Sequence, residues 1–142
     1  MRAIFDGVVD VEDGVCPVLP IGNSIEGGYM FLADVPELGI KLAGSHHPQR
    51  QIRALQRELL AHRRELGRVV VFGPYTHYMT LRIYWQKRVQ AARIPQRCGY
   101  FTDCTIDDLT LHLEWILENG IWSLHSRLAT QMNRLAAASA LG

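Results

Sequence analysis

The clearest pattern along the chain is a set of apolar side chains with helical spacing between Pro48 and Leu66. The apolar positions are Ile52, Leu55, Leu59 and Leu66. They fall on one side of a helix, as expected for a helix that covers a core. Pro48 suits the first turn, where its missing N–H costs nothing, and Gly67 suits the left-handed residue that ends a helix. We therefore expect one long helix over residues 48–66.

A stripe of arginines runs along the opposite side of this expected helix. Its members are Arg50, Arg53, Arg57 and Arg64. Their spacing of i, i+3, i+7 and i+14 keeps them within a strip about 60° wide. Glu58 and Glu65 fall on a different side, so nothing within the helix neutralises the stripe. The stripe is either solvated surface, or paired with acidic groups elsewhere in the fold, or a surface that binds anions.

The chain before this helix has the pattern of β structure. Short apolar runs occur at residues 3–5, 8–11, 15–21, 29–33 and 40–43, and Gly, Pro, Asn and Asp separate them. Pro17 and Pro20 restrict the third run to an edge strand or an irregular segment. Residues 2–43 are therefore expected to form an antiparallel meander of three or four strands, with an exposed loop at 23–28.

A second pair of strands is expected after the helix. Residues 68–72 are a β-branched run typical of a buried strand, and residues 73–77 have the composition of a turn. Apolar and polar positions then alternate through residue 86, which favours a strand and makes 68–86 a hairpin. The apolar positions are Met79, Leu81, Ile83 and Trp85, and the polar side includes Tyr78, Arg82 and Tyr84. The alternative for this segment is a helix over 76–92.

Basic and aromatic side chains share the polar side of that expected strand. Arg82 and Tyr84 lie on it, and Lys87 and Arg88 continue it. Aromatic rings among cations can stack bases and neutralise phosphates. The other interpretation is the solvated side of a half-buried sheet.

The last part of the chain is expected to form a helical hairpin. Residues 94–104 are expected to be a loop, and Thr105 with Asp108 gives a capping pattern that starts a helix ending near residue 118. A second helix is expected over 121–138, antiparallel to the first. Leu111 and Trp115 point away from the apolar stripe of the first helix, so they are either sandwiched in the core or part of a dimer or partner interface.

These elements together predict an α+β fold. An antiparallel β-sheet packs against one long central helix, and a helical hairpin follows at the C-terminal end. A length of 142 residues suits a single globular domain over residues 1–142.

Charge is strongly segregated along the chain, although the formal net charge is only +1. Residues 1–49 carry two basic and seven acidic side chains, and residues 98–142 carry two basic and five acidic ones. Residues 50–97 carry eleven basic and two acidic side chains. A dedicated nucleic-acid binder is usually basic overall, so this pattern favours a composite partner, such as a nucleoprotein complex, over naked duplex. No apolar run is long enough to span a membrane and no leader opens the chain, so we expect a cytoplasmic protein without a membrane partner.

Candidate chemistry is sparse. The cysteines are Cys16, Cys98 and Cys104, an odd number with irregular spacing, so we expect reduced thiols without a function. The pattern C-x5-C-x7-H that ends at His112 matches none of the common zinc patterns. His77 could act as a general base from its turn. We expect no catalytic residues, no cofactor and no metal ion.

The function expected from these features is that of a non-enzymatic binding protein. An arginine-rich face would dock on nucleic acid or on an acidic surface of a nucleoprotein complex, in the manner of a small phage or mobile-element inhibitor of a host machine. The expected partner-binding residues are Arg50, Arg53, Arg57, Arg64, Arg82, Tyr84, Lys87 and Arg88. Two alternatives stay open. One is a small enzyme that acts on an anionic substrate with His77, Cys98 or Cys104. The other is an assembly subunit that forms a homodimer through Leu111 and Trp115.

Overall fold

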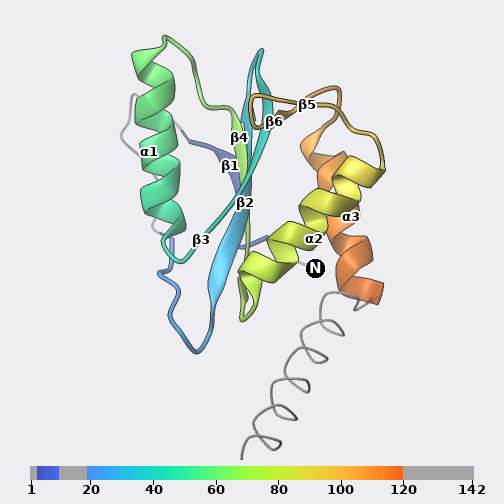
Figure 1. The fold of residues 1–142 in the computed structure, drawn as a ribbon. Coiled ribbons are helices and arrows are strands. Elements are labelled where there is room, and N and C mark those ends of the chain that lie inside the picture. The colour runs from blue at the N-terminus through green and yellow to red at the C-terminus, as the bar shows by residue number, and fades with distance from the viewer. Residues whose placement is uncertain (1–2, 10–18, 120–142) are drawn as a thin grey trace, which may run out of the picture.

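A six-stranded antiparallel sheet forms the middle layer of the protein, and helices cover both of its faces (Figure 1). The structure, a computed structural model, describes residues 3–9 and 19–119. The strands are β1 (Phe5–Val8), β2 (Gly28–Val35), β3 (Gly39–Ser45), β4 (Arg68–Tyr75), β5 (Gln96–Arg97) and β6 (Tyr100–Phe101), in the spatial order β1-β4-β2-β3-β6-β5. The helices are α1 (Pro48–Ala61), α2 (Tyr78–Ala91) and α3 (Ile106–Asn119). The predicted α+β class with an antiparallel sheet is therefore confirmed.

The central strands β2 and β4 are buried on both faces. Successive side chains of a strand point to opposite faces of the sheet, so a strand between two helical layers needs apolar residues at every position. Met30 and Leu32 of β2 point towards α2 and α3, whereas Phe31 and Ala33 pack on the side of α1. The strand expected at 68–72 is confirmed, because β4 covers it.

Helix α1 is fourteen residues long and is the one helix among residues 3–9 and 19–119 that packs on its face of the sheet. It begins at Pro48, as expected, but it ends at Ala61 and not at Leu66. Arg63 adopts the left-handed conformation with φ of 56°. The chain then closes the helix with two backbone hydrogen bonds, Arg64 N–H to Leu59 O at 2.8 Å and Arg63 N–H to Leu60 O at 3.0 Å.

The predicted helix over 48–66 is therefore too long, and the structure does not support one long central helix. All three described helices have fourteen residues, and α1 packs on one face of the sheet. Leu66 is nevertheless buried in the same cluster as Ile52, Leu55 and Leu59. It reaches that cluster from the segment after the helix, where Gly67 N–H donates to Asp34 O at 2.8 Å.

The segment predicted as the second strand of a hairpin is helix α2 instead. Its buried residues are Leu81, Trp85 and Val89, which recur every fourth position, whereas Met79 and Ile83 are exposed. The period-two alternation over 78–86 therefore does not reflect two faces of a strand. The alternative of a helix over 76–92 is confirmed, and the hairpin over 68–86 is wrong.

Strand β4 pairs with β1 on one side and with β2 on the other. The expected meander over 2–43 is correct for β2 and β3, which form a hairpin, but β1 does not pair with β2. Residues 94–104, expected to be a loop, add the short hairpin β5–β6 to the edge of β3. Part of the apolar run at 15–21 lies outside the described residues.

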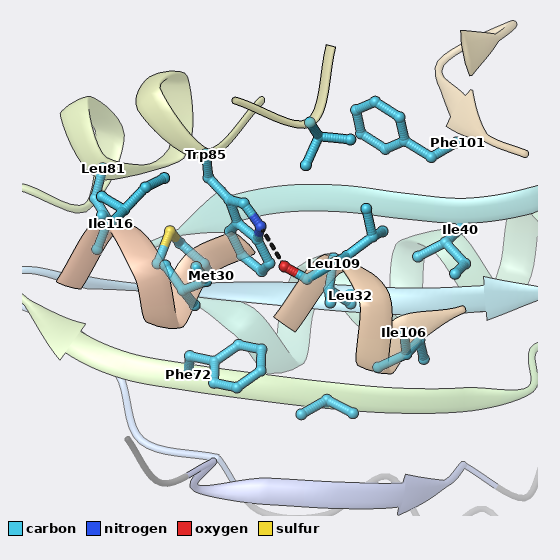
Figure 2. Packing of buried hydrophobic residues seen from close by; sticks show 13 residues of the cluster. Met30, Leu32, Ile40, Phe72, Leu81, Trp85, Phe101, Ile106, Leu109 and Ile116 are labelled. Carbon is cyan, nitrogen blue, oxygen red and sulfur yellow. Dashed lines mark hydrogen bonds between the residues drawn. The ribbon is translucent and has the colours of Figure 1, made fainter. Parts of the chain in front are cut away.

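The layer of α2 and α3 is fixed on the sheet by Trp85 (Figure 2). The Trp85 indole is fully buried, lies edge-on to the Phe72 ring with centroids 5.9 Å apart, and donates its Nε1–H to Leu109 O of α3 at 2.7 Å. A buried indole N–H without a partner would be costly, so this bond sets the position of α3 relative to α2.

Helix α3 starts where the sequence predicts. Thr105 N–H donates to the Asp108 carboxylate at 2.9 Å, and Asp108 N–H donates to Thr105 Oγ1 at 3.1 Å, which is a reciprocal capping box. The second helix of the expected hairpin, over 121–138, lies outside the described residues. Within residues 3–9 and 19–119, the structure contains no helix with the length and apolarity needed to cross a membrane.

Candidate binding surfaces

The eight residues predicted to bind a partner lie on two opposite sides of the sheet. Arg50, Arg53 and Arg57 belong to α1, and Arg64 follows that helix. Arg82, Tyr84, Lys87 and Arg88 all belong to α2, which packs on the other face (Figure 1). The structure therefore does not bring the eight residues together, and no single flat partner can contact both groups.

The first surface is the arginine face of α1, defined here as Arg50, Arg53 and Arg57. All three side chains are exposed, because Ile52, Leu55 and Leu59 bury the opposite side of the helix. Among residues 3–9 and 19–119, none of the three has an acidic partner or a side-chain hydrogen bond. The arginine face therefore presents three planar, permanently charged groups to solvent.

Arg64 does not belong to this face. It follows the left-handed residue that ends α1, and its guanidinium lies 3.7 Å from the carboxylate of Glu37, in the turn between β2 and β3. The prediction that four arginines share one side of the helix is thus wrong for Arg64, because the helix ends before that residue. The interpretation that the arginines are paired with acidic groups elsewhere holds for this one residue.

The second surface is the outer side of α2 and α3. Within α2, the basic side chains are Arg82, Lys87 and Arg88, and the helix has no acidic residue. The Arg88 guanidinium lies 3.5 Å above the Trp115 ring, a cation–π contact that joins α2 to α3. Arg82 donates to the side chain of Gln86 at 3.2 Å. The positive charge of α2 is therefore partly used to hold this layer together.

Two hollows flank the Arg88–Trp115 contact. One, of about 560 Å³, is lined by Tyr84, Lys87 and Ile116. The other, of about 520 Å³, is lined by Cys104, Asp108 and Leu111. His112 borders both hollows. Its pKa is lowered, first by burial and then by the nearby charge of Arg88, so its imidazole is neutral at pH 7.

Large apolar side chains are exposed on this second surface. Their exposed fractions are 63% for Leu111, 36% for Trp115, 46% for Met79 and 43% for Ile83. Within the described residues, Leu111 and Trp115 are therefore not sandwiched in the core. The exposure of Met79 and Ile83 was not predicted, because the strand interpretation placed them on the buried side with Leu81 and Trp85. Helical periodicity anchored on Trp85 would have shown them as exposed.

A third hollow, of about 310 Å³, lies at the start of α2. The Tyr78 hydroxyl lies 3.3 Å from His46 Nδ1, and the two rings meet edge to face. A Cβ at Gly28 would lie 2.6 Å from the Tyr78 ring, so glycine is needed there for the close approach of helix and sheet. The contacts of Tyr78 with His46 and Gly28 are therefore explained by the packing of α2 on the sheet.

His77 and the two cysteines considered for catalysis lie at opposite ends of α2. His77 precedes the first residue of α2, whereas Cys98 and Cys104 follow its last residue, and α2 is roughly 20 Å long. Burial, followed by the charges of Asp108, Asp103 and Asp34, raises the pKa of the Cys104 thiol. A thiol in that state is a poor nucleophile at neutral pH. Cys98 is exposed in the β5–β6 turn. Cys16 lies outside the described residues.

Within the described part of the chain, no group of three or more His, Cys, Asp or Glu side chains is arranged to hold a metal ion. Comparison of the chain with protein-family models, with curated proteins and with solved structures gave no match. The two exposed surfaces are therefore the features of the described residues that bear on function.

Proposed function

We propose that this is a non-enzymatic binding protein whose arginine face docks on the phosphates of a nucleic acid held in a nucleoprotein complex. The observation that carries the proposal is the arginine face itself, with three exposed guanidinium groups on one helix and no acidic partner among the described residues. An arginine side chain without an acidic partner is free to bind an anion. Each guanidinium can donate two parallel hydrogen bonds to one phosphate.

The spacing of the arginine face suits a phosphate chain. Arg50 and Arg57 are separated by seven residues, which is roughly 10 Å along the helix axis. Successive phosphates of one strand are about 3.4 Å apart along a duplex axis. Three arginines on this rod can therefore reach phosphates of a single strand without a change in the backbone of α1, which Ile52, Leu55 and Leu59 anchor to the sheet.

The distribution of charge supports a composite partner over naked duplex. The chain carries 15 basic and 14 acidic side chains, so its overall field does not attract a polyanion over long distances. A neighbouring protein surface would supply the remaining contacts and the specificity. A cytoplasmic location is part of this proposal. Arg82, Tyr84, Lys87 and Arg88 are left out of it, because α2 lies on the other face of the sheet.

The test is the double variant Arg53→Ala/Arg57→Ala, with double-stranded DNA of mixed sequence as a probe of the phosphate contacts alone, without the protein part of the composite partner. Each phosphate contact contributes about 0.9 to the slope of log affinity against log salt concentration, so losing two contacts should flatten the slope by about 1.8. The matched control is Arg82→Ala/Lys87→Ala, which removes the same charge from the opposite face and should leave binding to the arginine face intact. Affinity is measured by fluorescence anisotropy at several salt concentrations.

Two outcomes would contradict the proposal. If the α1 double variant loses stability while its folded fraction binds as before, the arginines serve the fold. If both double variants weaken binding equally, the effect is one of net charge. A capture experiment from the native host, with and without nuclease, then separates a nucleic-acid partner from an acidic protein surface. With an acidic protein, the same arginines would act mainly on the association rate.

A further inference from the structure

We propose that the outer face of the α2–α3 layer is an interface with a second copy of this chain, related by a two-fold axis. Leu111 and Trp115 are one helical turn apart on α3, and Met79 and Ile83 are one turn apart on α2. All four are large apolar side chains that the described fold leaves exposed. Two pairs of exposed apolar side chains on neighbouring helices, with the basic side chains Lys87 and Arg88 near them, are typical of a protein–protein interface.

The shape of the outer face of the α2–α3 layer suits helix packing between two copies. The Arg88–Trp115 contact forms a ridge with a hollow on either side, and the larger hollow has a volume of about 560 Å³. Two helical layers pack by placing ridges in grooves.

Charge identifies the partner as a second copy. Helix α2 carries Arg82, Lys87 and Arg88 and no acidic residue. Helix α3 carries no lysine or arginine, and its acidic residues are Asp107, Asp108, Glu114 and Glu118. A two-fold interface joins the same surface patch of both copies. Helix α2 of each copy can therefore face α3 of the other copy. Basic helix then meets acidic helix twice, and the surface is its own electrostatic complement.

The proposal is independent of the proposed function, because α1 lies on the opposite face of the sheet. Joining two copies through α2 and α3 leaves both arginine faces exposed at the two ends of the dimer. Loss of the dimer would therefore leave each arginine face intact, and loss of the arginine face would leave the dimer intact.

Two charge-reversal variants test the arrangement without knowledge of the register. The first, Arg82→Glu/Lys87→Glu, makes α2 acidic at two positions. The second, Glu114→Lys/Glu118→Lys, makes α3 basic at two positions. In each homodimer, helices of like charge then face each other in both halves. In a mixture of the two variants, one half has both signs reversed and the other half has its native signs, so opposite charges meet again.

Mass is measured by sedimentation equilibrium over a wide concentration range, and circular dichroism confirms that each variant is folded. The wild-type chain should dimerise as concentration rises, and each variant alone should dissociate at concentrations roughly tenfold higher or more. An equal mixture should recover the wild-type dissociation constant. The matched control, Arg53→Glu/Arg57→Glu on α1, should leave the mass unchanged.

The proposal is overturned if the wild-type chain stays monomeric, or if the mixture dissociates as readily as the separate variants. The variant Leu111→Ser separates the causes of a monomeric result. If the wild type is monomeric and this variant also melts at a lower temperature, the face is covered within the chain itself and not by a second copy.

Discussion

Two arginines, Arg63 and Arg93, hold backbone conformations that helix ends usually give to glycine. Their φ angles are 56° and 60°, in the left-handed region, where a Cβ costs about 1 kcal/mol or more. Each follows a helix, and the next residue donates its N–H back to the last turn, Arg64 to Leu59 O and Ile94 to Val89 O. Both helices therefore end in the same motif with a residue that does not favour it.

Replacing either arginine with glycine should stabilise the protein. We expect Arg63→Gly and Arg93→Gly each to raise the free energy of unfolding by about 0.5–1 kcal/mol, since glycine adopts positive φ without steric cost. Arg57→Gly, inside α1, is the matched control and should lower it by about 1 kcal/mol. Urea denaturation measures all three. A destabilised Arg63→Gly variant would mean that the Arg63 side chain stabilises the fold through contacts of its own.

These positions also show why the end of α1 could not be read from the sequence. Gly67 is the stronger glycine signal, and Leu66 extends the apolar spacing of Leu55 and Leu59. The helix ends earlier because the chain must return to the sheet, where Gly67 pairs with Asp34. The backbone pairing with the sheet therefore sets the end of α1, and the local helix-ending signals in the sequence do not predict it.

At the scale of elements, one side chain connects two strands and a helix. The Arg68 guanidinium binds both carboxylate oxygens of Asp6 at 2.8 Å, which ties β4 to β1, and it lies 3.4 Å from the Asp107 carboxylate at the start of α3. The hydrogen bonds from Arg68, helped by its charge, lower the pKa of Asp6, while partial burial opposes the shift. A lowered folded-state pKa means that the pair stabilises the fold above the ordinary pKa of the group.

The variant Asp6→Asn should therefore be less stable than the wild type by about 0.5–1 kcal/mol at neutral pH, a value limited by the exposure of the pair. As pH falls below 3.8, the unfolded chain takes up the proton first, and the difference should shrink and vanish below the lowered pKa. Urea denaturation across this pH range measures it. Asp107→Asn, at a longer and more exposed contact, is the control with the smaller effect. A difference independent of pH would show that Asp6 acts through packing.

Elements were predictable where one local pattern decides them. The capping pair Thr105 and Asp108 placed the start of α3, and the apolar run at 68–72 placed β4. Helix α2 was only the alternative prediction, because its outer side carries Met79 and Ile83, which imitate the alternation of a strand. The exposure of those two side chains is itself the unusual feature, so the same residues explain both the error and the candidate interface.

At the scale of the whole molecule, the sheet separates two surfaces with different chemistry. The sequence shows one basic segment over residues 50–97, which suggests one basic surface. The fold sends α1 and α2 to opposite faces, so the basic charge is divided between them. The order of the elements in the sequence does not determine which face of the sheet a helix covers, because that depends on the spatial order of the strands. The arginine face could be predicted from spacing alone, whereas its separation from Arg82 and Lys87 could not.

The strand order also bears on how the chain acquires its structure in time. Strands β2 and β3 are joined by a short turn, whereas Asp6 of β1 and Arg68 of β4 pair across 62 residues. Closing a longer loop costs more entropy, so the hairpin should form early, β4 should join it next, and β1 should dock last, although it is synthesised first. We expect backbone amides of β1 to exchange with solvent deuterium before those of β2 and β4, as mass spectrometry of peptic fragments would show. Equal protection of all three strands would instead make the sheet one cooperative unit, with its earliest segment as firmly held as its centre.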